Sequence, residues 1–573
     1  MSVEVEVAVE VAALRAAWEA GDPADFALRQ ACAGRLQALR GLYRERAGAF
    51  SSQDVAALRA VSEALARPPP RKVLASPREV LKATFGFDTF RLGQEEIITA
   101  VLAGRDCVGV MPTGAGKSLT YQLPARALGG TALVISPLIA LMKDQVDAMN
   151  EVGVRATFLN SSLEPDERRA RVEQLRRGEI ELLYAAPEGL EASVGPALSG
   201  VPLSLIAVDE AHCISQWGHD FRPAYRNLHG LKARFGGVPI LALTATATRE
   251  VTDDIAAQLG MQAPALFRGS FFRPNLKLHA YKKGEGVETR DSILRLCRAR
   301  AGQSGIVYCL SRKGVEQTAE FLRHGGVRAR PYHAGFESGE RDQAQDAFQR
   351  DDVDVIVATV AFGMGIDKSN IRYVIHRDMP RSIEGYYQEI GRAGRDGLPS
   401  DCVLFYSWAD VMSFERMIEG DGDNGERQRE KVREMFRYAE AQQCRHQLLV
   451  RYLGEKAAPC ETSCDRCRPG DVVGEAPAAP RQGRGKRRAD LPAAQAAAPS
   501  SAEEAVFLKL KAVRKRIADE KKLPAYIVFS DATLWAMAST LPSSEAELLG
   551  VPGVGPKKLS QYGTEFLAAL AAP

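Results

Sequence analysis

The chain has 573 residues, which is too long for a single hydrophobic core, so we expect three to five domains. With 45% hydrophobic and 26% charged residues it has the composition of a soluble globular protein, and no window is apolar for long enough to cross a membrane. The net charge of only +3 excludes nucleic-acid binding through a global positive field and leaves local basic patches as the alternative.

Residues 1–70 form the first segment, which ends in prolines at 68–70. It is rich in Ala, Leu, Arg and Glu, which predicts a helical extension. Residues 3–10 alternate apolar and acidic side chains, so a strand is the alternative there. The acidic start lacks the basic residues of a secretory signal, which favours the cytoplasm. Without a catalytic motif, the segment fits a packing or partner-binding role as well as a merely solubilising one.

A Gly-rich turn follows a short apolar run in the sequence DCVGVMPTGAGKS, residues 106–118. Glycines in this turn allow the backbone to wrap closely around phosphate groups, toward which its amides point. The lysine would reach the β- and γ-phosphates, and the serine would ligate magnesium. The strict pattern has Gly where this chain has Met111, but the remaining core between strand and helix predicts nucleotide binding. The predicted phosphate loop consists of Thr113, Gly114, Ala115, Gly116, Lys117 and Ser118.

Two adjacent carboxylates, Asp209 and Glu210, follow the apolar residues 205–208, which predict a strand buried on both faces. In an open parallel sheet, ligands lie at the carboxyl ends of the strands. One acid there would hold magnesium and the other would orient a water molecule. The next stretch mixes aromatic rings with polar and cationic groups, a surface on which nucleic-acid bases can stack. Its candidate DNA contacts are Gln216, Trp217, His219, Phe221 and Arg222.

Apolar runs alternate with helical stretches through most of the chain, which predicts doubly wound parallel sheets. The runs begin at residue 131, continue at 181–185 and 240–243, and restart at 305–309, 327–332, 353–358 and 371–375. We therefore predict two α/β lobes, residues 77–270 and 271–412. The second ends in QEIGRAGR, where Arg392 and Arg395 would form a mobile cationic clamp for phosphate charge in a transition state.

These motifs occur in the order used by superfamily 2 helicases, and their continuations resemble RecQ DNA helicases over residues 77–470. The similar segments are FRLGQEEII, MPTGAGKS, VDEAHCISQWGHDFRPAY, SFFRPN, YHAG, ATVAFGMGIDK and YYQEIGRAGRDG. The aromatic continuation of DEAH is the most diagnostic, because RNA-directed DEAH helicases share only the tetrapeptide. The resemblance implies two RecA-like lobes that close on ATP and translocate 3′ to 5′ on DNA.

The resemblance also implies roles for single residues at the ATP site. The residues are Arg91 and Gln94 for adenine, Lys117 and Ser118 for phosphate and magnesium, Asp209 for magnesium, Glu210 for the attacking water, Gln388, Arg392 and Arg395 for catalysis with Arg395 as the arginine finger, and Gly365 and Asp367 as further nucleotide contacts. The aromatic loop would report DNA occupancy to this site through its direct chain connection to the two acids.

Four of the ten cysteines cluster, which in a reducing compartment indicates a metal site rather than disulfides. Cys444 stands sixteen residues before Cys460, and CETSCDRC continues to Cys464 and Cys467. Four thiolates at this spacing suit tetrahedral zinc in a closed structural site, within a module at 413–469. The RecQ zinc module is similar, although the gap between Cys460 and Cys464 is three residues where the family usually has two.

Residues 470–500 are rich in Pro, Ala, Gly and Arg, which predicts a flexible basic linker. In the fuller RecQ plan a winged-helix domain occupies this place. The linker is shorter than the roughly 50 residues that a domain needs, so we expect the winged helix to be absent.

Residues 501–573 predict a small helical domain similar to the HRDC (helicase and RNase D C-terminal) module. Ser501 would cap its first helix. Lys557 and Lys558, next to a Gly-Val-Gly turn, would contact a DNA phosphate. Tyr526 would stack on a base, with core packing as the alternative.

The whole sequence thus predicts an α/β protein with two RecA-like lobes, a helical zinc module and a small all-α C-terminal domain. We interpret it as a monomeric bacterial, nucleoid-associated helicase that uses ATP, Mg²⁺ and Zn²⁺ on single-stranded and forked DNA, away from membranes, with single-strand-binding protein or recombination factors as partners in repair. The alternatives are a translocase or annealing factor that unwinds poorly, a nucleotide-gated DNA-binding scaffold, and an RNA helicase.

Overall fold

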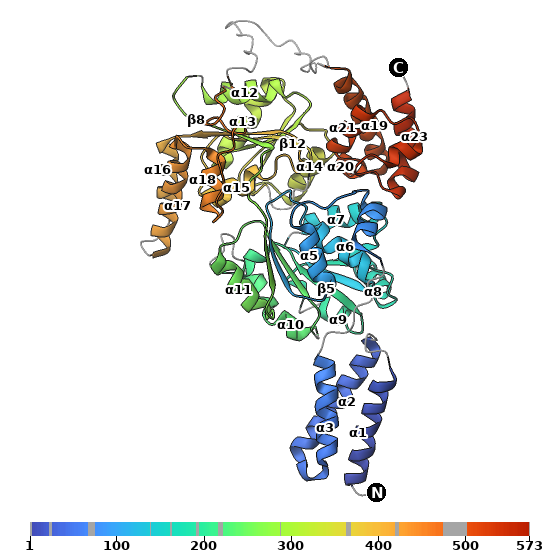
Figure 1. Ribbon diagram of the computed structural model, residues 1–573. Coiled ribbons are helices and arrows are strands. Elements are labelled where there is room, and N and C mark those ends of the chain that lie inside the picture. The colour runs from blue at the N-terminus through green and yellow to red at the C-terminus, as the bar shows by residue number, and fades with distance from the viewer. Residues whose placement is uncertain are drawn as a thin grey trace.

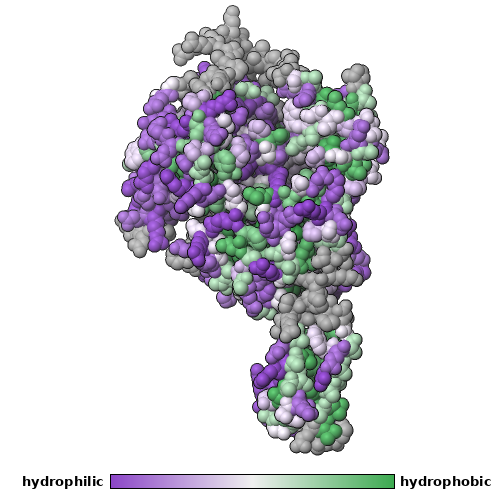
Figure 2. Space-filling model, in the orientation of Figure 1, coloured by the Kyte–Doolittle hydropathy of each residue, from purple (hydrophilic) through white to green (hydrophobic). Residues whose placement is uncertain are grey.

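The protein was analysed as a computed structural model that describes residues 3–21, 26–66, 75–137, 139–160, 163–190, 194–215, 222–235, 237–286, 288–362, 368–418, 423–470, 472–473 and 501–571. An N-terminal helical bundle, two α/β lobes, a zinc module and a C-terminal helical domain follow one another along the chain (Figure 1). The face drawn in Figure 2 is mostly hydrophilic over the second lobe and the zinc module. Among the described residues, no helix is long and apolar enough to cross a membrane.

The N-terminal bundle has a small hydrophobic core of its own. Its elements are α1 (Val3–Ala20), α2 (Phe26–Glu45), a 3₁₀ turn η1 (Ala47–Ala49) and α3 (Ser52–Ala66). Val7, Val11 and Leu14 are buried and recur at helical spacing on one face of α1, where they meet Leu36 and Leu58. The strand alternative for residues 3–10 is therefore wrong, because the buried positions follow a period of 3.6 rather than 2.

Lobe 1 is built on a parallel sheet with helices on both faces. Within the described part of the chain the strand order is β3-β4-β2-β5-β6-β1-β7, and every pairing is parallel. The strands are β1 (Cys107–Val110), β2 (Thr131–Ile135), β3 (Ala156–Leu159), β4 (Leu182–Ala185), β5 (Leu203–Val208), β6 (Ile240–Thr244) and β7 (Ala265–Arg268). The helices and turns are α4 (Pro77–Val80), the π-helical turn η2 (Leu81–Phe85), α5 (Gln94–Leu102), α6 (Leu119–Leu128), α7 (Ile139–Glu151), α8 (Pro165–Arg176), α9 (Gly195–Ala197), η4 (Ala211–Ile214), η5 (Pro223–Leu228), α10 (Leu231–Arg234) and α11 (Arg249–Leu259).

Lobe 2 repeats this plan with the described strand order β10-β11-β9-β12-β13-β8, again all parallel. Its strands are β8 (Leu276–Lys282), β9 (Ser304–Tyr308), β10 (Ala329–Tyr332), β11 (Val355–Ala358), β12 (Ile371–His376) and β13 (Ser400–Tyr406). Its helices are α12 (Thr289–Ala299), α13 (Arg312–His324), α14 (Ser338–Gln349) and α15 (Ile383–Ile390). The prediction of two lobes with parallel sheets is confirmed.

The zinc module packs on the outer edge of lobe 2 through its cysteine-bearing loop. Its helices are α16 (Trp408–Met417), α17 (Asp423–Glu440) and α18 (Arg445–Tyr452). Leu278 of β8 donates to Ser463 O (3.0 Å) and accepts from Asp465 N (2.9 Å), so the loop extends the sheet beyond its last strand. The Asp465 carboxylate also pairs with Arg445, which is only 1% exposed.

The C-terminal domain is a compact set of helices that lies beside both lobes (Figure 1). They are α19 (Ala502–Lys521), α20 (Ala525–Val528), α21 (Asp531–Thr540), α22 (Glu545–Leu549) and α23 (Pro556–Ala571). Ser501 caps α19 by accepting from Glu504 N, as predicted. Leu510, Phe529 and Phe566 lie in its core. Most of the predicted linker, 474–500, lies outside the described residues.

Candidate functional site

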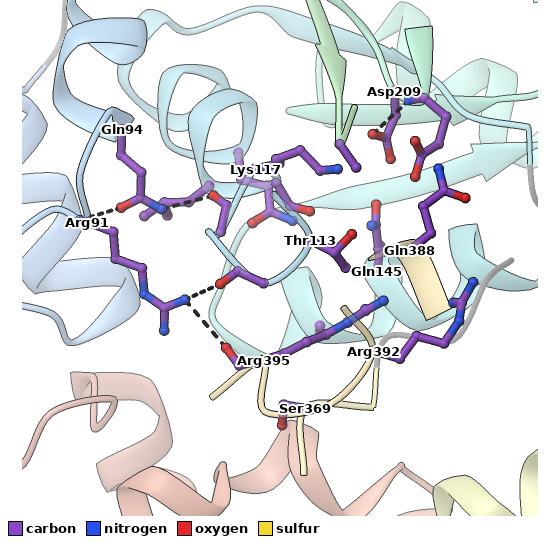
Figure 3. A pocket seen from close by; sticks show the side chains of 18 of the residues that line it. Arg91, Gln94, Thr113, Lys117, Gln145, Asp209, Ser369, Gln388, Arg392 and Arg395 are labelled. Carbon is purple, nitrogen blue, oxygen red and sulfur yellow. Dashed lines mark hydrogen bonds between the residues drawn. The ribbon is translucent and has the colours of Figure 1, made fainter. Parts of the chain in front are cut away.

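A cavity of about 660 Å³ lies at the carboxyl ends of β1, β5 and β6 and is closed on the other side by lobe 2. This volume is in the range of small-molecule sites. The predicted site residues that line it are Arg91, Gln94, Thr113, Gly114, Gly116, Lys117, Ser118, Asp209, Glu210, Arg222, Gln388, Arg392, Arg395 and Tyr526. Figure 3 shows Lys117, Asp209 and Gln388 near one another, with Arg392 and Arg395 below them. The fold therefore brings together motifs that are almost 300 residues apart in the chain.

The phosphate loop depends on its two glycines. Gly114 and Gly116 have φ of 84° and 80°, in the left-handed region that side chains disfavour. A Cβ on Gly116 would also lie 2.4 Å from Nε2 of Gln94. Ser118 begins the turn into α6, with its carbonyl accepting from Gln122 N. The side chain of Ala115, also predicted to contact nucleotide, is not part of the cavity wall.

Gln94 and Arg91 hold the phosphate loop from the side where adenine was expected. Gln94 is 2% exposed, and its Nε2 donates to Gly116 O (2.9 Å) and Ala115 O (3.3 Å). Its Oε1 accepts from Arg91 N (2.8 Å), and the Arg91 guanidinium donates to Gly114 O (2.6 Å; Figure 3). The amide of Gln94 thus points at the phosphate loop in this structure. To contact adenine, the Gln94 side chain would have to break these hydrogen bonds and form new ones to the base.

The two acids at the end of β5 are tied to the end of β6. Asp209 is 8% exposed and its Oδ1 accepts from Glu210 N (3.0 Å). Glu210 itself has a left-handed backbone, with φ of 47°. His212 Nδ1 lies 2.9 Å from Thr244 Oγ1 and 3.4 Å from Glu210 Oε2. The Thr244 hydroxyl also donates to Thr246 O (3.0 Å), so the His212 ring packs between the end of β6 and the side chain of Glu210.

Arg273, which the residue-level reasoning missed, bridges the two lobes beneath the cavity. Its guanidinium donates to Thr113 O of the phosphate loop (2.7 Å). On lobe 2 it donates to the carbonyls of Gly391 (3.3 Å), Ala393 (3.0 Å) and Gly394 (2.8 Å). The lobe 2 acceptors are backbone atoms directly before the predicted arginine finger, Arg395, so one side chain fixes the phosphate loop relative to that segment.

The site is electropositive. Burial lowers the pKa of Arg273 below its usual value, and the neighbouring guanidiniums of Arg395 and Arg91 lower it further. Burial also lowers the pKa of Arg91. A guanidinium nevertheless stays protonated in proteins. Crowded, partly desolvated cations of this kind are stabilised by a polyanion, so the cavity suits a nucleotide polyphosphate.

The structure does not describe six of the candidate residues. Gln216, Trp217, His219 and Phe221, as well as Gly365 and Asp367, lie outside the described residues. Both ends of the aromatic loop are nevertheless fixed near the acids. Arg222 lines the cavity and its N–H donates to Cys213 O (3.0 Å), and the hydroxyl of buried Tyr225 donates to Asp209 O (2.8 Å).

The expected DNA contacts of the C-terminal domain face lobe 1 or the domain itself. Lys557 Nζ donates to Asn150 O of α7. Lys558 Nζ donates to Ile527 O (2.6 Å), and burial lowers its pKa to about 8. Tyr526 belongs to the wall of the cavity rather than to the domain core or to a surface facing away from the lobes. In this structure Lys557 thus contacts lobe 1, Lys558 contacts its own domain, and Tyr526 faces the cavity.

The four clustered cysteines fit a zinc ion. Their sulfur atoms all lie within 4.8 Å of one another, and Sγ of Cys444 and Cys464 are 4.0 Å apart. Tetrahedral zinc with Zn–S bonds of about 2.3 Å places its sulfurs about 3.8 Å apart. Glu461, in the longer gap after Cys460, has φ of 61°, a tight left-handed turn that accommodates the additional residue. The unusual spacing therefore leaves the sulfur cluster compact.

Family models match four parts of the chain. They describe a DEAD/DEAH box helicase at residues 91–255, a helicase conserved C-terminal domain at 288–397, a RecQ zinc-binding domain at 408–468 and an HRDC domain at 503–570.

Curated relatives match almost the whole chain. A protein of Pasteurella multocida named ATP-dependent DNA helicase RecQ is 39% identical over 588 residues, covering 85% of this chain and 92% of the relative. Proteins of the same name from Haemophilus influenzae and Bacillus subtilis are 39% and 36% identical, and each alignment covers 87% of this chain and 96% and 99% of the relatives, respectively.

Proposed function

The chain belongs to the RecQ family of ATP-dependent DNA helicases, and we propose that it couples ATP hydrolysis to 3′-to-5′ translocation on single-stranded DNA and to duplex unwinding. One observation carries this proposal: the phosphate loop of lobe 1 and the segment from Gln388 to Arg395 of lobe 2 line the same cavity. Because each lobe supplies part of the site, binding and loss of the γ-phosphate change how strongly the lobes attract each other. A change of lobe separation during each turnover is the basis of stepping along a strand.

The hydrolytic roles follow from the placement of charge around the cavity. Lys117 and the loop amides would bind the β- and γ-phosphates. Glu210, whose Oε2 lies 3.4 Å from His212 Nδ1, would position the attacking water. Arg395, with Arg392 beside it, would stabilise the charge that develops in the transition state, an effect worth about 10³–10⁵ in turnover for arginine fingers.

Magnesium and zinc would have separate roles. Ser118 and Asp209, both on the cavity wall, would hold Mg²⁺, which neutralises phosphate charge when bound. Cys444, Cys460 and Cys464, together with Cys467, would hold Zn²⁺ in a purely structural site, because the cluster lies at the outer edge of lobe 2 and none of its cysteines lines the cavity.

The proposed substrate is forked or tailed DNA in recombination and repair. The protein would act as a monomer at the bacterial nucleoid, together with single-strand-binding protein or recombination factors. The aromatic loop at 216–221 would sense the single strand, because its flanking residues Ser215 and Arg222 lie next to the elements that carry Asp209 and Glu210.

The test is ATP-dependent strand displacement on a forked duplex with a 3′ single-stranded tail, with DNA-stimulated ATP hydrolysis followed in the same reaction. Lys117→Ala should abolish both activities. Lys313→Ala, which removes an exposed lysine of α13 away from the cavity, is the matched control and should change neither.

The outcomes separate the candidate functions. Displacement by the wild type that is lost in Lys117→Ala identifies a helicase. Strong DNA-stimulated hydrolysis without strand displacement would indicate a translocase or a strand-remodelling factor instead of a helicase. Stimulation by RNA of equal sequence as strong as by DNA would overturn the choice of substrate.

A further inference from the structure

We propose that the C-terminal helical domain forms part of the ATP site: Tyr526 contacts the base and ribose of the bound nucleotide, and docking of the domain on both lobes is coupled to nucleotide binding. This inference rests on the proposed ATP site and adds a binding residue and a controlling interface to it. It assigns to Tyr526 a role at the cavity, which it lines together with Phe87, Phe90 and Arg91.

On lobe 1 the domain docks next to the segment expected to hold adenine. Gly553 N donates to Gly86 O (3.0 Å), and Gly86 closes the π-helical turn η2 with φ of 73°. A Cβ on Gly86 would lie 2.6 Å from the backbone carbon of Val554. The chain continues from this contact directly into Phe87, Phe90 and Arg91 of the cavity wall. Close backbone packing of this kind links the position of the domain to the position of that wall.

A second contact on lobe 1 involves the end of α7. The hydroxyl of Tyr562 donates to Glu151 Oε2 (2.6 Å), and the amino group of Lys557 donates to Asn150 O. The α7 helix also contributes Gln145 and Ala148 to the cavity wall. The domain thus touches two separate elements of lobe 1 that both border the cavity.

On lobe 2 the docking is made by buried charges. Arg514, fully buried, pairs with Asp531 of its own domain (2.7 Å) and lies 3.7 Å from Asp351 of lobe 2. Asp351 also pairs with Lys368, which is fully buried as well. Burial of paired charges requires that both partners stay in place, because removal of one leaves the other unpaired in the interior.

The lobe 2 contact also leads directly to the cavity. Lys368 is followed by Ser369, which lines the cavity wall (Figure 3). At the rim of the interface, Lys515 pairs with Asp352 (2.7 Å) and donates to Arg350 O (2.9 Å). The domain therefore bridges both lobes across the site at which they meet, with Tyr526 placed over the cavity between the two anchoring regions.

Coupling follows from this placement by linkage. If the nucleotide binds more tightly when the domain is docked, docking must become more favourable by the same factor when the nucleotide is bound. The side chains of Lys557 and Tyr526 cannot contact DNA while they contact lobe 1 and the cavity. Binding of DNA by this face would then require undocking and would weaken nucleotide binding.

The first test replaces the ring of Tyr526 in the full-length chain. Equilibrium binding of a non-hydrolysable ATP analogue is measured with Mg²⁺ and without DNA. Tyr526→Ala should weaken binding about 5- to 150-fold, the range for loss of one aromatic–base contact. Tyr526→Phe keeps the ring and should bind within about 3-fold of the wild type. Unchanged analogue binding by Tyr526→Ala, together with weaker binding of single-stranded DNA, would overturn the proposal in favour of base stacking with DNA.

The second test undocks the domain without altering its interior. The nearest atoms to a Cβ on Gly555 belong to lobe 1, with Thr84 O at 3.1 Å, and the residue has no left-handed backbone. Gly555→Val should therefore clash only with the docked arrangement. Gly41→Val, at a helical position in the N-terminal bundle with nothing within 4 Å, is the matched control.

Gly555→Val should increase the radius of gyration in small-angle X-ray scattering and weaken analogue binding as much as Tyr526→Ala, with no further loss in the double variant. Release of the domain with unchanged affinity would refute the coupling. If Gly555→Val does not fold, the charge reversal Lys515→Asp, rescued by Asp352→Lys, gives the same comparison. Lys117→Ala should lose analogue binding in every background; if it does not, the assigned ATP site is wrong rather than the role of Tyr526.

Discussion

Replacement of Arg273 by methionine should lower the turnover of ATP without much change in nucleotide affinity. Methionine retains the unbranched stem but removes all of the guanidinium hydrogen bonds that join Thr113 to the carbonyls of Gly391, Ala393 and Gly394. The phosphate loop keeps its own support, because Arg91 and Gln94 still hold its carbonyls. The loss should therefore affect the alignment of the arginine finger more than the binding of phosphate.

The size of this effect follows from the bond that crosses between the lobes. A hydrogen bond from a charged group contributes about 1.5–3 kcal/mol, and among the described residues the bond to Thr113 O, at 2.7 Å, is the one that links the Arg273 side chain to lobe 1. Since 1.4 kcal/mol corresponds to a factor of ten, we expect kcat to fall about 10- to 150-fold. The three lobe 2 carbonyls would lose a partner too, which should lower the stability of lobe 2 by about 1–3 kcal/mol.

Steady-state ATP hydrolysis at saturating single-stranded DNA separates kcat from KM, and thermal unfolding reports on stability. Arg298→Met is the control, because Arg298 donates to Gly325 O (2.7 Å) within lobe 2 alone. It should reduce stability without changing kcat. An Arg273→Met enzyme with wild-type kcat, or a loss of kcat equal to that in Arg298→Met, would show that the bridge between the lobes does not position the arginine finger.

Three further predictions concern the DNA loop, the zinc module and the connection between the lobes. Trp217→Ala should keep ATP binding but lose stimulation of hydrolysis by DNA, because both ends of its loop are anchored beside Asp209; normal stimulation would exclude the loop as the sensor. Removal of zinc by a chelator should release one zinc per chain and lower the unfolding temperature. Cys464→Ser, at the buried cysteine beside Leu278, should lower the unfolding temperature more than Cys467→Ser. Release of zinc without loss of stability would rule out a structural metal. Glu455→Gln should lower the free energy of unfolding by about 1–3 kcal/mol, because the Glu455 carboxylate accepts from Ser270 Oγ and Phe271 N, both at 2.6 Å, in the connection between the lobes. We expect the midpoint of urea denaturation to fall while the affinity for the ATP analogue stays unchanged. An unchanged midpoint would contradict this prediction.

The sequence predicted most of the strands as apolar runs, including the edge strand β10 at 327–332, and it missed β3, β7, β8 and the interior strand β13. The runs at 305–309 and 353–358 correspond to β9 and β11 in the interior of lobe 2. Strands β3, β7 and β8 lie at edges, and β8 alternates buried and exposed positions that include Lys277 and Lys282. Their residues lack a continuous apolar run, so pairing with a neighbour rather than composition determines these strands.

The site residues also divide into those that the sequence predicts and those whose role only the fold reveals. Lys117, Asp209 and Arg395 stand in local motifs that are recognisable without a structure, and the fold brings them to one cavity. Arg273 belongs to the quoted SFFRPN segment, but its acceptors are backbone carbonyls, which leave no side-chain pattern in a sequence. The position of Tyr526 depends on packing between elements more than 400 residues apart, which local spacing does not encode.

The contact between the cysteine-bearing loop and β8 also bears on solubility. An edge strand with free N–H and C=O groups is a template for pairing with another chain. Here Ser463 and Asp465 take up the outward-facing groups of Leu278, and Asp465 also accepts from Ala280 N (3.2 Å). Loss of the loop's fold would uncover this edge. Metal-depleted protein should therefore self-associate through strand pairing before the lobes themselves unfold, so its failure in the cell would take the form of aggregation rather than simple inactivity.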